Sequence, residues 1–288
     1  MSASSPAAVP QTGTIRLGLI GDNIAASSSP RLHVLAGLQN GRTVTYDRLV
    51  PREMGMEFDP LFAHVAADGY RGVNVTYPYK ERAAAKVQVD DPLVRAIGAV
   101  NAVIFEDGKA RGFNTDYSGF IAAYRAVRGD EAPGPVLMIG AGGVGKAVAF
   151  GLIALGLAEI RIADRDVAKA DALAEALKVV RPELVTRTGP EAADLSTGAS
   201  GLINCTPVGM VGYGGTPLER ARMTGAAWVF DAVYTPVDTP FLKDAEAEGL
   251  TIISGYELFF GQGVDAWAIF TGLPLDHGRL RQDLLKPE

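Results

Sequence analysis

The segment VLMIGAGGVGKA (136–147) joins an apolar strand to a helix through a glycine-rich turn. Gly140, Gly142 and Gly145 match the G-x-G-x-x-G pattern of dinucleotide-binding loops, and the same turn matches most of a triphosphate-binding P-loop. A P-loop ends in Ser or Thr because that hydroxyl binds the magnesium ion of the triphosphate, whereas Ala147 stands at this position. The turn therefore predicts a dinucleotide whose pyrophosphate lies at the N-terminus of the helix.

An acidic residue follows this turn at close to the ~20-residue spacing that dinucleotide-binding folds use. Asp164 ends the next apolar run, EIRIAD (159–164), where a carboxylate accepts hydrogen bonds from an adenosine ribose and repels a 2′-phosphate. Arg165 would attract such a phosphate, but Asp166 adds a second negative charge. We expect NAD as the cofactor and NADP as the alternative, since a tenfold preference needs only ~1.4 kcal/mol.

Strands and helices alternate along the chain in two blocks. The first block predicts strands at 15–21, 43–50 and 72–76, helices at 30–38, 53–67 and 78–87, and an antiparallel hairpin at 101–113. The second predicts strands at 136–140, 159–164, 201–207, 228–234 and 250–254, with helices at 143–156, 166–180, 256–271 and 275–286. Continuous apolar strands between helices are typical of parallel sheets covered on both faces. We expect the Gly- and Pro-rich segment 128–135 to connect the blocks, Pro78 to lie in the first turn of its helix, and the terminal helices to pack back on the first block.

Composition favours a small-molecule ligand. The 288 residues carry a net charge of -6 without a block of basic residues, which argues against nucleic-acid and membrane partners. The longest apolar run, 147–158, falls short of the ~20 residues of a membrane span. The single Cys205 excludes an internal disulfide, so we expect a cytoplasmic protein. We expect no metal site, because the three histidines lack metal-ligand spacing.

Three polar clusters of the first block are candidates for chemistry. Ser27 and Ser29 lie at the start of a helix, where serines also act as caps. Lys80 lies in the first turn of a helix, where its charge opposes the positive helix end and some other interaction should offset it. Asp116 stands at the start of a later helix, where a capping role is again the alternative.

The clusters belong to an ordered set of motifs that resembles the shikimate dehydrogenase family over nearly the whole chain. The motifs are SSSP, GVNVTYPYK, GAVNAV, GFNTDYSGF, GAGGVGKA, NCTPVGM, VYTPVDTPF and GYELFFGQGVDAW. The resemblance implies a two-domain α/β fold, in which a discontinuous α/β substrate domain accompanies a Rossmann dinucleotide-binding domain. We expect a disordered tail at 1–14, the substrate domain at 15–116 and 255–288, and the Rossmann domain at 117–254.

The resemblance also implies roles for individual residues. Lys80 and Asp116 correspond to the catalytic pair, with Lys80 as proton donor in the reducing direction and Asp116 orienting it. The substrate-binding positions are Ser27, Ser29, Asn74, Thr76, Lys80, Asn101, Asp116, Tyr234 and Gln262. The cofactor-binding positions are Gly140, Ala141, Gly142, Gly143, Val144, Gly145, Asp164, Arg165, Cys205, Thr206, Pro207, Val233 and Gly255.

The implied activity is NAD(P)-dependent hydride transfer between the nicotinamide and shikimate or 3-dehydroshikimate, as in aromatic amino acid biosynthesis. Quinate, aminoshikimate and a folate derivative are alternative substrates, and an NAD-sensing module is the alternative without catalysis. Ala102 and Leu258 stand where the family has Thr and Met, and the Thr to Ala change removes a hydroxyl. Ser29 favours shikimate, while the Asp164 turn resembles dual-substrate members. The direction of the reaction and a homodimeric state are left open.

Overall fold

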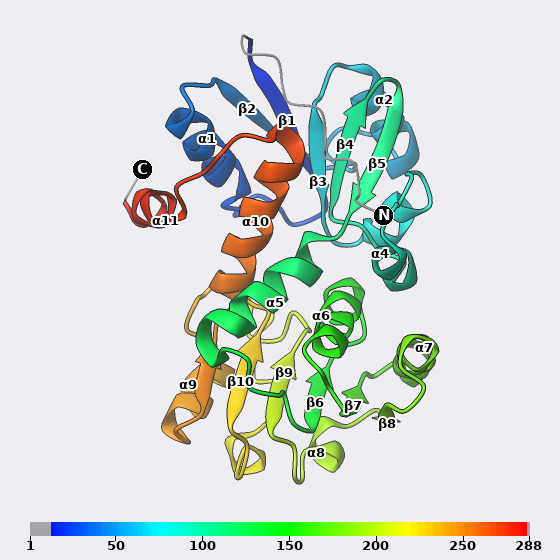
Figure 1. The fold of residues 1–288 in the computed structure, drawn as a ribbon, viewed down its shortest axis with the longest axis vertical. Helices are drawn as coiled ribbons and strands as arrows, with labels where there is room; N and C mark the ends of the chain where they lie inside the picture. Colours follow the sequence, from blue (N-terminus) through cyan, green and yellow to red (C-terminus); the bar gives the residue numbers. More distant parts are fainter. Residues whose placement is uncertain (1–12, 287–288) are drawn as a thin grey trace. The chain divides into compact units, whose positions relative to one another are not determined.

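The computed structural model describes residues 13–286, so the expected disordered tail lies outside the described residues except for its last two positions. The chain divides into two compact units. The first comprises residues 1–115 and 262–288, and the second comprises residues 116–261. Each unit contains its own sheet (Figure 1).

The first unit is built on a mixed five-stranded sheet in the order β2-β1-β3-β4-β5. Its strands are β1 (Ile15–Ile20), β2 (Val44–Leu49), β3 (Gly72–Val75), β4 (Ala102–Glu106) and β5 (Lys109–Phe113). Its helices are α1 (Ser29–Gln39), α2 (Phe58–Ala67), α3 (Lys80–Ala84), α4 (Pro92–Ile97), α11 (His277–Leu285) and the second half of α10 (Gly255–Thr271). β1 pairs in parallel with β2 and β3, while β3, β4 and β5 pair antiparallel. This confirms the predicted alternation with an antiparallel hairpin at its edge.

Two apolar clusters cover the two faces of this sheet. One joins the sheet to α2 and includes Phe58, Leu61 and Val73, all fully buried. The other joins β1 and β4 to α1 and α10, where Trp267 and Phe270 are fully buried. Figure 1 shows the C-terminal half of α10 in front of β1, and both elements contribute residues to this cluster.

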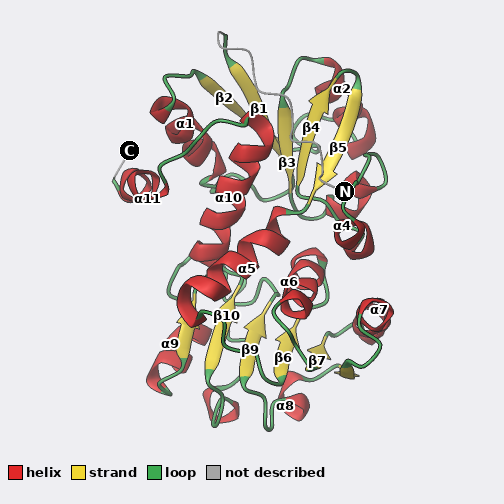
Figure 2. Cartoon of the chain, viewed as in Figure 1, coloured by secondary structure: helices red, strands yellow, loops and turns green. Residues whose placement is uncertain are grey.

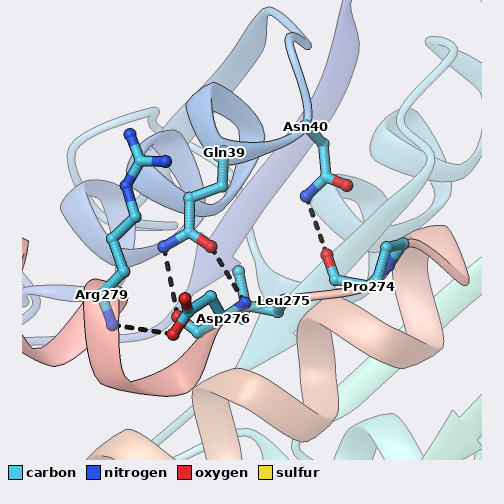
Figure 3. Close-up of a pocket in the computed structure, with 6 residues that line it drawn as sticks. All are labelled: Gln39, Asn40, Pro274, Leu275, Asp276 and Arg279. Carbon is cyan, nitrogen blue, oxygen red and sulfur yellow. Dashed lines mark hydrogen bonds between the residues drawn. The ribbon is translucent and has the colours of Figure 1, made fainter.

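The C-terminal helix α11 is fastened to the end of α1 by side-chain amides (Figure 3). The Gln39 side chain exchanges two hydrogen bonds with the backbone of Asp276, donating to its carbonyl at 3.3 Å and accepting from its N–H at 3.0 Å. Asn40 donates to the carbonyl of Pro274 at 2.9 Å. The residues that make these bonds line a shallow surface hollow, and the bonds hold the start of α11 against the end of α1.

The predicted helix at 78–87 is wrong in length and in the place given to Pro78. The helix α3 begins at Lys80, two residues after Pro78, and the Tyr77–Pro78 peptide is cis. Gln88 pairs with Arg111 of β5 and exchanges backbone hydrogen bonds with neighbouring residues of that strand. The chain therefore leaves the helix because pairing with the sheet edge replaces further helical turns.

The second unit is a parallel six-stranded sheet in the order β11-β10-β9-β6-β7-β8. Its strands are β6 (Val136–Ile139), β7 (Glu159–Ala163), β8 (Val185–Gly189), β9 (Gly201–Asn204), β10 (Trp228–Asp231) and β11 (Thr251–Ile253). Its helices are α5 (Thr115–Arg128), which starts on the last residue of the first unit, then α6 (Gly143–Ala154), α7 (Val167–Val180), α8 (Ala192–Leu195) and α9 (Pro240–Ala247), followed by the first half of α10. Figure 2 shows β10, β9 and β6 as neighbouring arrows with one direction.

This strand order is the doubly wound order of dinucleotide-binding folds. From β6 the chain adds β7 and β8 on one side and then β9, β10 and β11 on the other, so the order of strands reverses between β6 and β9. In open sheets of this kind, ligands bind at the carboxyl ends of the strands that flank the reversal. The segment 128–135, expected to connect the blocks, instead joins α5 to β6 inside the second unit.

Candidate active site

The three glycines of the turn after β6 have three different surroundings. Gly140 has a φ of +100°, and a Cβ there would lie 2.9 Å from backbone atoms of Cys205. A Cβ at Gly145 would lie 2.1 Å from the carbonyl oxygen of Gly140, so helix α6 packs directly on the turn. A Cβ at Gly142 would meet nothing within 4 Å. Gly140 and Gly145 therefore shape the turn, and Gly142 leaves its outer side open to a ligand.

The N-terminus of α6 fits the pyrophosphate of a dinucleotide. Gly142 is its N-cap and supplies no side-chain cap, and no acidic residue occupies the first turn. The N–H groups of the first turn, which begins at Gly143 and Val144, therefore remain available to an anion, and the helix dipole favours negative charge at this end.

Asp164 lies immediately after β7 and is tied to the glycine turn. Its Oδ2 accepts a hydrogen bond from the Ala141 N–H at 2.8 Å, and its Oδ1 accepts one from the Asp166 N–H at 2.9 Å. Each carboxylate oxygen has a second lone pair, so this side chain can also accept from a ribose hydroxyl. Arg165 and Asp166 are exposed beside it.

The loop after β9 is organised by Asn204, which is fully buried. The Asn204 Oδ1 accepts hydrogen bonds from the backbone N–H of Thr206 at 3.0 Å and from its hydroxyl at 2.6 Å. The Asn204 amide donates to the carbonyl of Val208 at 3.0 Å. Cys205, Thr206 and Pro207 therefore sit in a fixed turn, and Cys205 and Thr206 pack against Gly140.

The end of β10 carries a buried carboxylate, Asp231, which the sequence analysis did not single out. It accepts hydrogen bonds from Asn204, from the Val233 N–H and from Thr239. Burial raises its pKa to about 6, and these three donors oppose the shift. The only signal in the sequence was the position of an acidic residue at the end of an apolar run.

Three further candidates of the second unit lie near these strand ends. Burial raises the pKa of the Cys205 thiol, and the negative charges of Asp231 and Asp116 raise it further, which places both carboxylates within electrostatic reach of this thiol. Asp116 is itself buried. Tyr234 stacks on Phe259 of α10, with ring centroids 4.9 Å apart.

Gly255 lies at the start of α10, where the chain passes very close to β10. A Cβ at this position would lie 2.5 Å from the carbonyl oxygen of Val233 and 2.6 Å from that of Asp231. Only glycine fits there without a shift of the backbone, so Gly255 holds the start of α10 against the end of β10.

In the first unit, the serines at the start of α1 are not ordinary caps. Ser28 is the N-cap and makes no side-chain capping bond. Instead the Ser27 Oγ accepts a hydrogen bond from the Ser29 N–H at 3.3 Å, and Arg48 donates to the Ser27 carbonyl at 3.1 Å. Two hydroxyls and one guanidinium therefore gather at the N-terminus of α1, an arrangement suited to a carboxylate.

Asn74 and Asn101 are joined in one buried hydrogen-bond chain. The Tyr46 hydroxyl donates to the Asn74 Oδ1 at 2.9 Å, and the Asn74 amide donates to the Asn101 carbonyl at 3.2 Å. The Asn101 Oδ1 accepts from the N–H and the hydroxyl of Thr115, at 2.7 and 3.2 Å. The Thr115 hydroxyl in turn lies 3.5 Å from the Gln262 Oε1. Tyr46 was missed by sequence reasoning, whereas Thr115 belongs to the polar cluster at the start of the later helix, where a cap is the alternative.

Within the first unit the structure brings Asn74, Asn101 and Gln262 together and places the backbone of Lys80 beside them. Lys80 is 9% exposed, and its carbonyl accepts from the Val100 N–H, next to Asn101. A Cβ at Gly21 would lie 2.2 Å from the Thr76 methyl group, so the chain after β1 packs on Thr76. Lys80 belongs to the first unit and Asp116 is the first residue of the second, so their pairing stays a prediction.

Among residues 13–286, no helix is both long and apolar enough to cross a membrane. The same residues contain no group of three or more His, Cys, Asp or Glu side chains that could hold a metal ion.

Comparison with known proteins matches each of the two units to a domain of one enzyme family. The family described as shikimate dehydrogenase substrate binding domain matches residues 19–103, and that described as shikimate/quinate 5-dehydrogenase matches residues 127–188. The quinate/shikimate dehydrogenase (NAD(+)) of Corynebacterium efficiens is 36% identical over 94% of this chain and 98% of that protein. The shikimate dehydrogenase (NADP(+)) of Arthrobacter sp. (strain FB24) is 35% identical over 94% of each chain. The structure of quinate dehydrogenase from Corynebacterium glutamicum in complex with NAD aligns with a TM-score of 0.87 and 34% identity, over 94% of this chain and 99% of that one.

Proposed function

The chain belongs to the shikimate dehydrogenase family, and from this membership we propose that it catalyses the reversible oxidation of shikimate to 3-dehydroshikimate with a nicotinamide cofactor. The observation that carries the proposal is that the second unit has the features of a cofactor site and the first unit has the groups that could bind the substrate. The second unit has a doubly wound sheet with an open glycine turn at the reversal of strand order. The first unit contains a buried lysine and also serine, threonine and amide side chains, which suit a polyhydroxy acid.

The substrate would be held by side chains of the first unit. Ser27 and Ser29 at the N-terminus of α1 would bind its carboxylate, and Thr76 and Gln262 would bind hydroxyls. The Oδ1 of Asn101 is already used by Thr115, so Asn101 would offer its amide hydrogens to a substrate oxygen.

Asn74 would act on the substrate indirectly, through Asn101. Its oxygen accepts from Tyr46 and its nitrogen donates to the Asn101 carbonyl, and the side chain is 6% exposed. We therefore place Asn74 as the residue that fixes Asn101, rather than as a direct ligand. Tyr234 keeps its proposed substrate contact from the second unit.

Lys80 and Asp116 would carry the proton chemistry. The bound cofactor supplies or removes the hydride, which leaves negative charge on the substrate oxygen in the reducing direction. A lysine ammonium placed at that oxygen stabilises the charge and donates a proton to it. Asp116 would orient the ammonium and bind a neighbouring substrate hydroxyl.

NAD is the preferred cofactor in this proposal, with NADP as a slower alternative. Asp164 stands where a 2′-phosphate would have to bind, and Asp166 adds a further negative charge beside it. The glycine turn, Arg165, the turn from Cys205 to Pro207, Val233 and Gly255 would complete the cofactor site.

Quinate is the second candidate substrate, because the NAD-dependent relative from Corynebacterium efficiens is named for both quinate and shikimate. Initial rates with shikimate and with quinate, each against NAD and NADP, test the proposal. We expect NADH formation with shikimate and a kcat/KM at least about tenfold higher with NAD than with NADP, a difference of ~1.4 kcal/mol. Absence of turnover with both acids and both cofactors would overturn it.

We place the enzyme in the cytoplasm, in keeping with its single free cysteine. We also keep a homodimer as a prediction, and light scattering of the purified protein at micromolar concentration tests it through the measured mass.

A further inference from the structure

The carboxyl ends of β9 and β10 are linked by a buried polar network that centres on Asp231. Asp231, Asn204 and Thr239 are each 0% exposed. The Asp231 Oδ1 accepts from the Asn204 amide at 2.9 Å and from the Val233 N–H at 3.0 Å. The Asp231 Oδ2 accepts from the Thr239 hydroxyl at 2.6 Å. Every partner of this carboxylate is a hydrogen-bond donor.

This pattern requires a group that only accepts. An asparagine at position 231 would turn one oxygen into an NH₂ group facing a donor. The Thr239 hydroxyl already accepts from the Leu242 N–H at 3.2 Å at the start of α9, so its proton needs an acceptor of its own. A carboxylate satisfies all three donors, whereas an amide leaves one of them unmatched.

Keeping a carboxylate here works against folding. Burial is the largest influence on Asp231 and raises its pKa to about 6 from 3.8, with hydrogen-bond donors rather than a cation opposing the shift. A buried charge that is not paired with a cation lowers the stability of the folded state. The network therefore keeps a carboxylate in place at a cost to the stability of the fold.

The network fixes the two loops that follow β9 and β10. Asn204 holds the turn from Cys205 to Val208, and Asp231 holds the backbone of Val233 and the cap of α9. Gly255 at the start of α10 packs on the carbonyls of Asp231 and Val233. One carboxylate therefore sets the relative position of three backbone segments at this edge of the sheet.

These segments lie on one side of the glycine turn. In a doubly wound sheet the pyrophosphate lies at the turn after the first strand, and the acid after the second strand binds the adenosine ribose. Here these are the turn after β6 and Asp164 after β7, so the remaining half of the dinucleotide extends over the ends of β9 and β10. That half is the nicotinamide with its ribose.

We propose that Asp231 is a positioning residue for the nicotinamide half of the cofactor, acting through the loops that follow β9 and β10. The inference rests on the proposed function, because it needs a dinucleotide on the second unit. It predicts that damage to the network weakens ligands that carry the nicotinamide half and spares those that end at the adenosine side.

Calorimetric binding of NAD and of ADP, which ends at the pyrophosphate and lacks the nicotinamide and its ribose, separates these effects. In Asp231→Asn we expect the Kd for NAD to rise about tenfold and that for ADP to stay within about twofold. Thr239→Val removes one donor to Asp231 and the acceptor of the Leu242 N–H but keeps the carboxylate. It should change NAD binding in the same direction by less, and it carries the test if the asparagine variant does not fold. Asp194→Asn, an exposed change in the same unit, is the matched control and should bind both ligands as the wild type does.

The pH dependence of NAD affinity is a second measurement. A purely structural role for Asp231 would not make it differ between the wild type and Asp231→Asn. Protonation of Asp231 replaces an acceptor by a donor, so wild-type affinity for NAD should fall as the pH drops through about 6, while Asp231→Asn stays weak and flat from pH 5 to 8. The titratable group facing Asp231 is the Cys205 thiol, whose pKa is raised and which stays protonated in this range, and Asp116 acts on the same thiol. The three histidines all belong to the first unit.

Three results would overturn the inference. In the first, Asp231→Asn binds NAD as the wild type does. In the second, the affinities for NAD and ADP weaken equally, which would make the network a general support of the fold. In the third, acid weakens NAD binding to the same extent in both proteins. Failure of the wild type to bind either ligand would overturn the proposed function, and this inference with it.

Discussion

At the scale of single residues, Lys80 bears the chemistry of the proposed reaction. Its side chain is the cation among the substrate-side candidates, and it is buried at the start of α3. We expect Lys80→Ala to lower kcat by about 10²- to 10⁴-fold, the usual effect of losing a positioned proton donor, with a much smaller change in the KM for shikimate. Initial rates over a range of shikimate concentrations measure both.

The control for this variant is Lys86→Ala, which removes the same group six residues along the chain. Lys86 forms an ion pair with Asp59 at 3.0 Å and is 31% exposed, so its loss should leave kcat within about twofold. Near-normal turnover in Lys80→Ala would show that another group donates the proton.

Asp164 is expected to decide between the two cofactors. In Asp164→Asn the side-chain oxygen can still accept from the Ala141 N–H, so the glycine turn keeps its anchor while the charge is lost. The ratio of kcat/KM for NADP to that for NAD should rise at least about tenfold, equal to ~1.4 kcal/mol. Asp166→Asn, the neighbouring exposed carboxylate, should change the ratio less, and an unchanged ratio in Asp164→Asn would remove the basis for the NAD preference.

Where α6 meets the glycine turn, two glycines allow effects on stability to be measured separately from effects on NAD binding. Gly145→Ala places a methyl group 2.1 Å from the Gly140 carbonyl, so α6 must shift, and we expect a loss of about 1–3 kcal/mol in stability. Gly142→Ala meets no atom within 4 Å, so stability should fall by less than about 1 kcal/mol while the methyl group obstructs the pyrophosphate. Urea unfolding and NAD titration of both variants test this contrast. Equal NAD affinity in Gly142→Ala and the wild type would contradict it.

The strand and helix pattern of both units could be predicted wherever apolar runs were long. Elements that were missed are short or polar. The edge strand β8 reads VTRTG and is half exposed, so no apolar run marks it. The helix α9 has a Thr–Pro start, a cap signal that could have revealed it. α3 was predicted too long because the pairing of Gln88 with β5 is a tertiary contact that no local pattern shows.

Part of the candidate site could likewise be predicted from the sequence, and part of it could not. The glycine turn and Asp164 follow from spacing, because a doubly wound sheet fixes where each strand ends. Asn204, Asp231 and Tyr46 escaped because each acts through hydrogen bonds to residues distant in sequence. Such partners become apparent only when strand order is known.

At the scale of the whole molecule, His33 should make stability depend on pH. It is buried in the first unit against Tyr46, and burial lowers its pKa from 6.5 to about 3. Below pH 6.5 the unfolded chain therefore binds a proton that the folded chain does not, so stability falls as the pH drops, by about 2–3 kcal/mol at pH 4.5. Asp231 acts in the opposite sense, because its raised pKa lets the folded chain bind a proton between about 6 and 3.8.

Replacement of His33 isolates its contribution. We expect His33→Phe, which keeps an aromatic ring beside Tyr46, to lose less stability than the wild type between pH 7 and 4.5, by about 2–3 kcal/mol. Urea unfolding at several pH values measures the difference. Parallel curves for the two proteins would show that His33 is not held neutral in the folded state.

In the proposed reaction, Lys80 of the first unit donates a proton to a substrate that exchanges a hydride with a cofactor on the second. A crystal structure of the ternary complex with NAD and shikimate tests this arrangement. We expect the Lys80 Nζ within about 2.6–3.2 Å of the hydroxyl that is oxidised, and the shikimate carboxylate at Ser27 and Ser29. Shikimate bound elsewhere, or with that hydroxyl beyond the reach of Lys80, would show that Lys80 is not the proton donor.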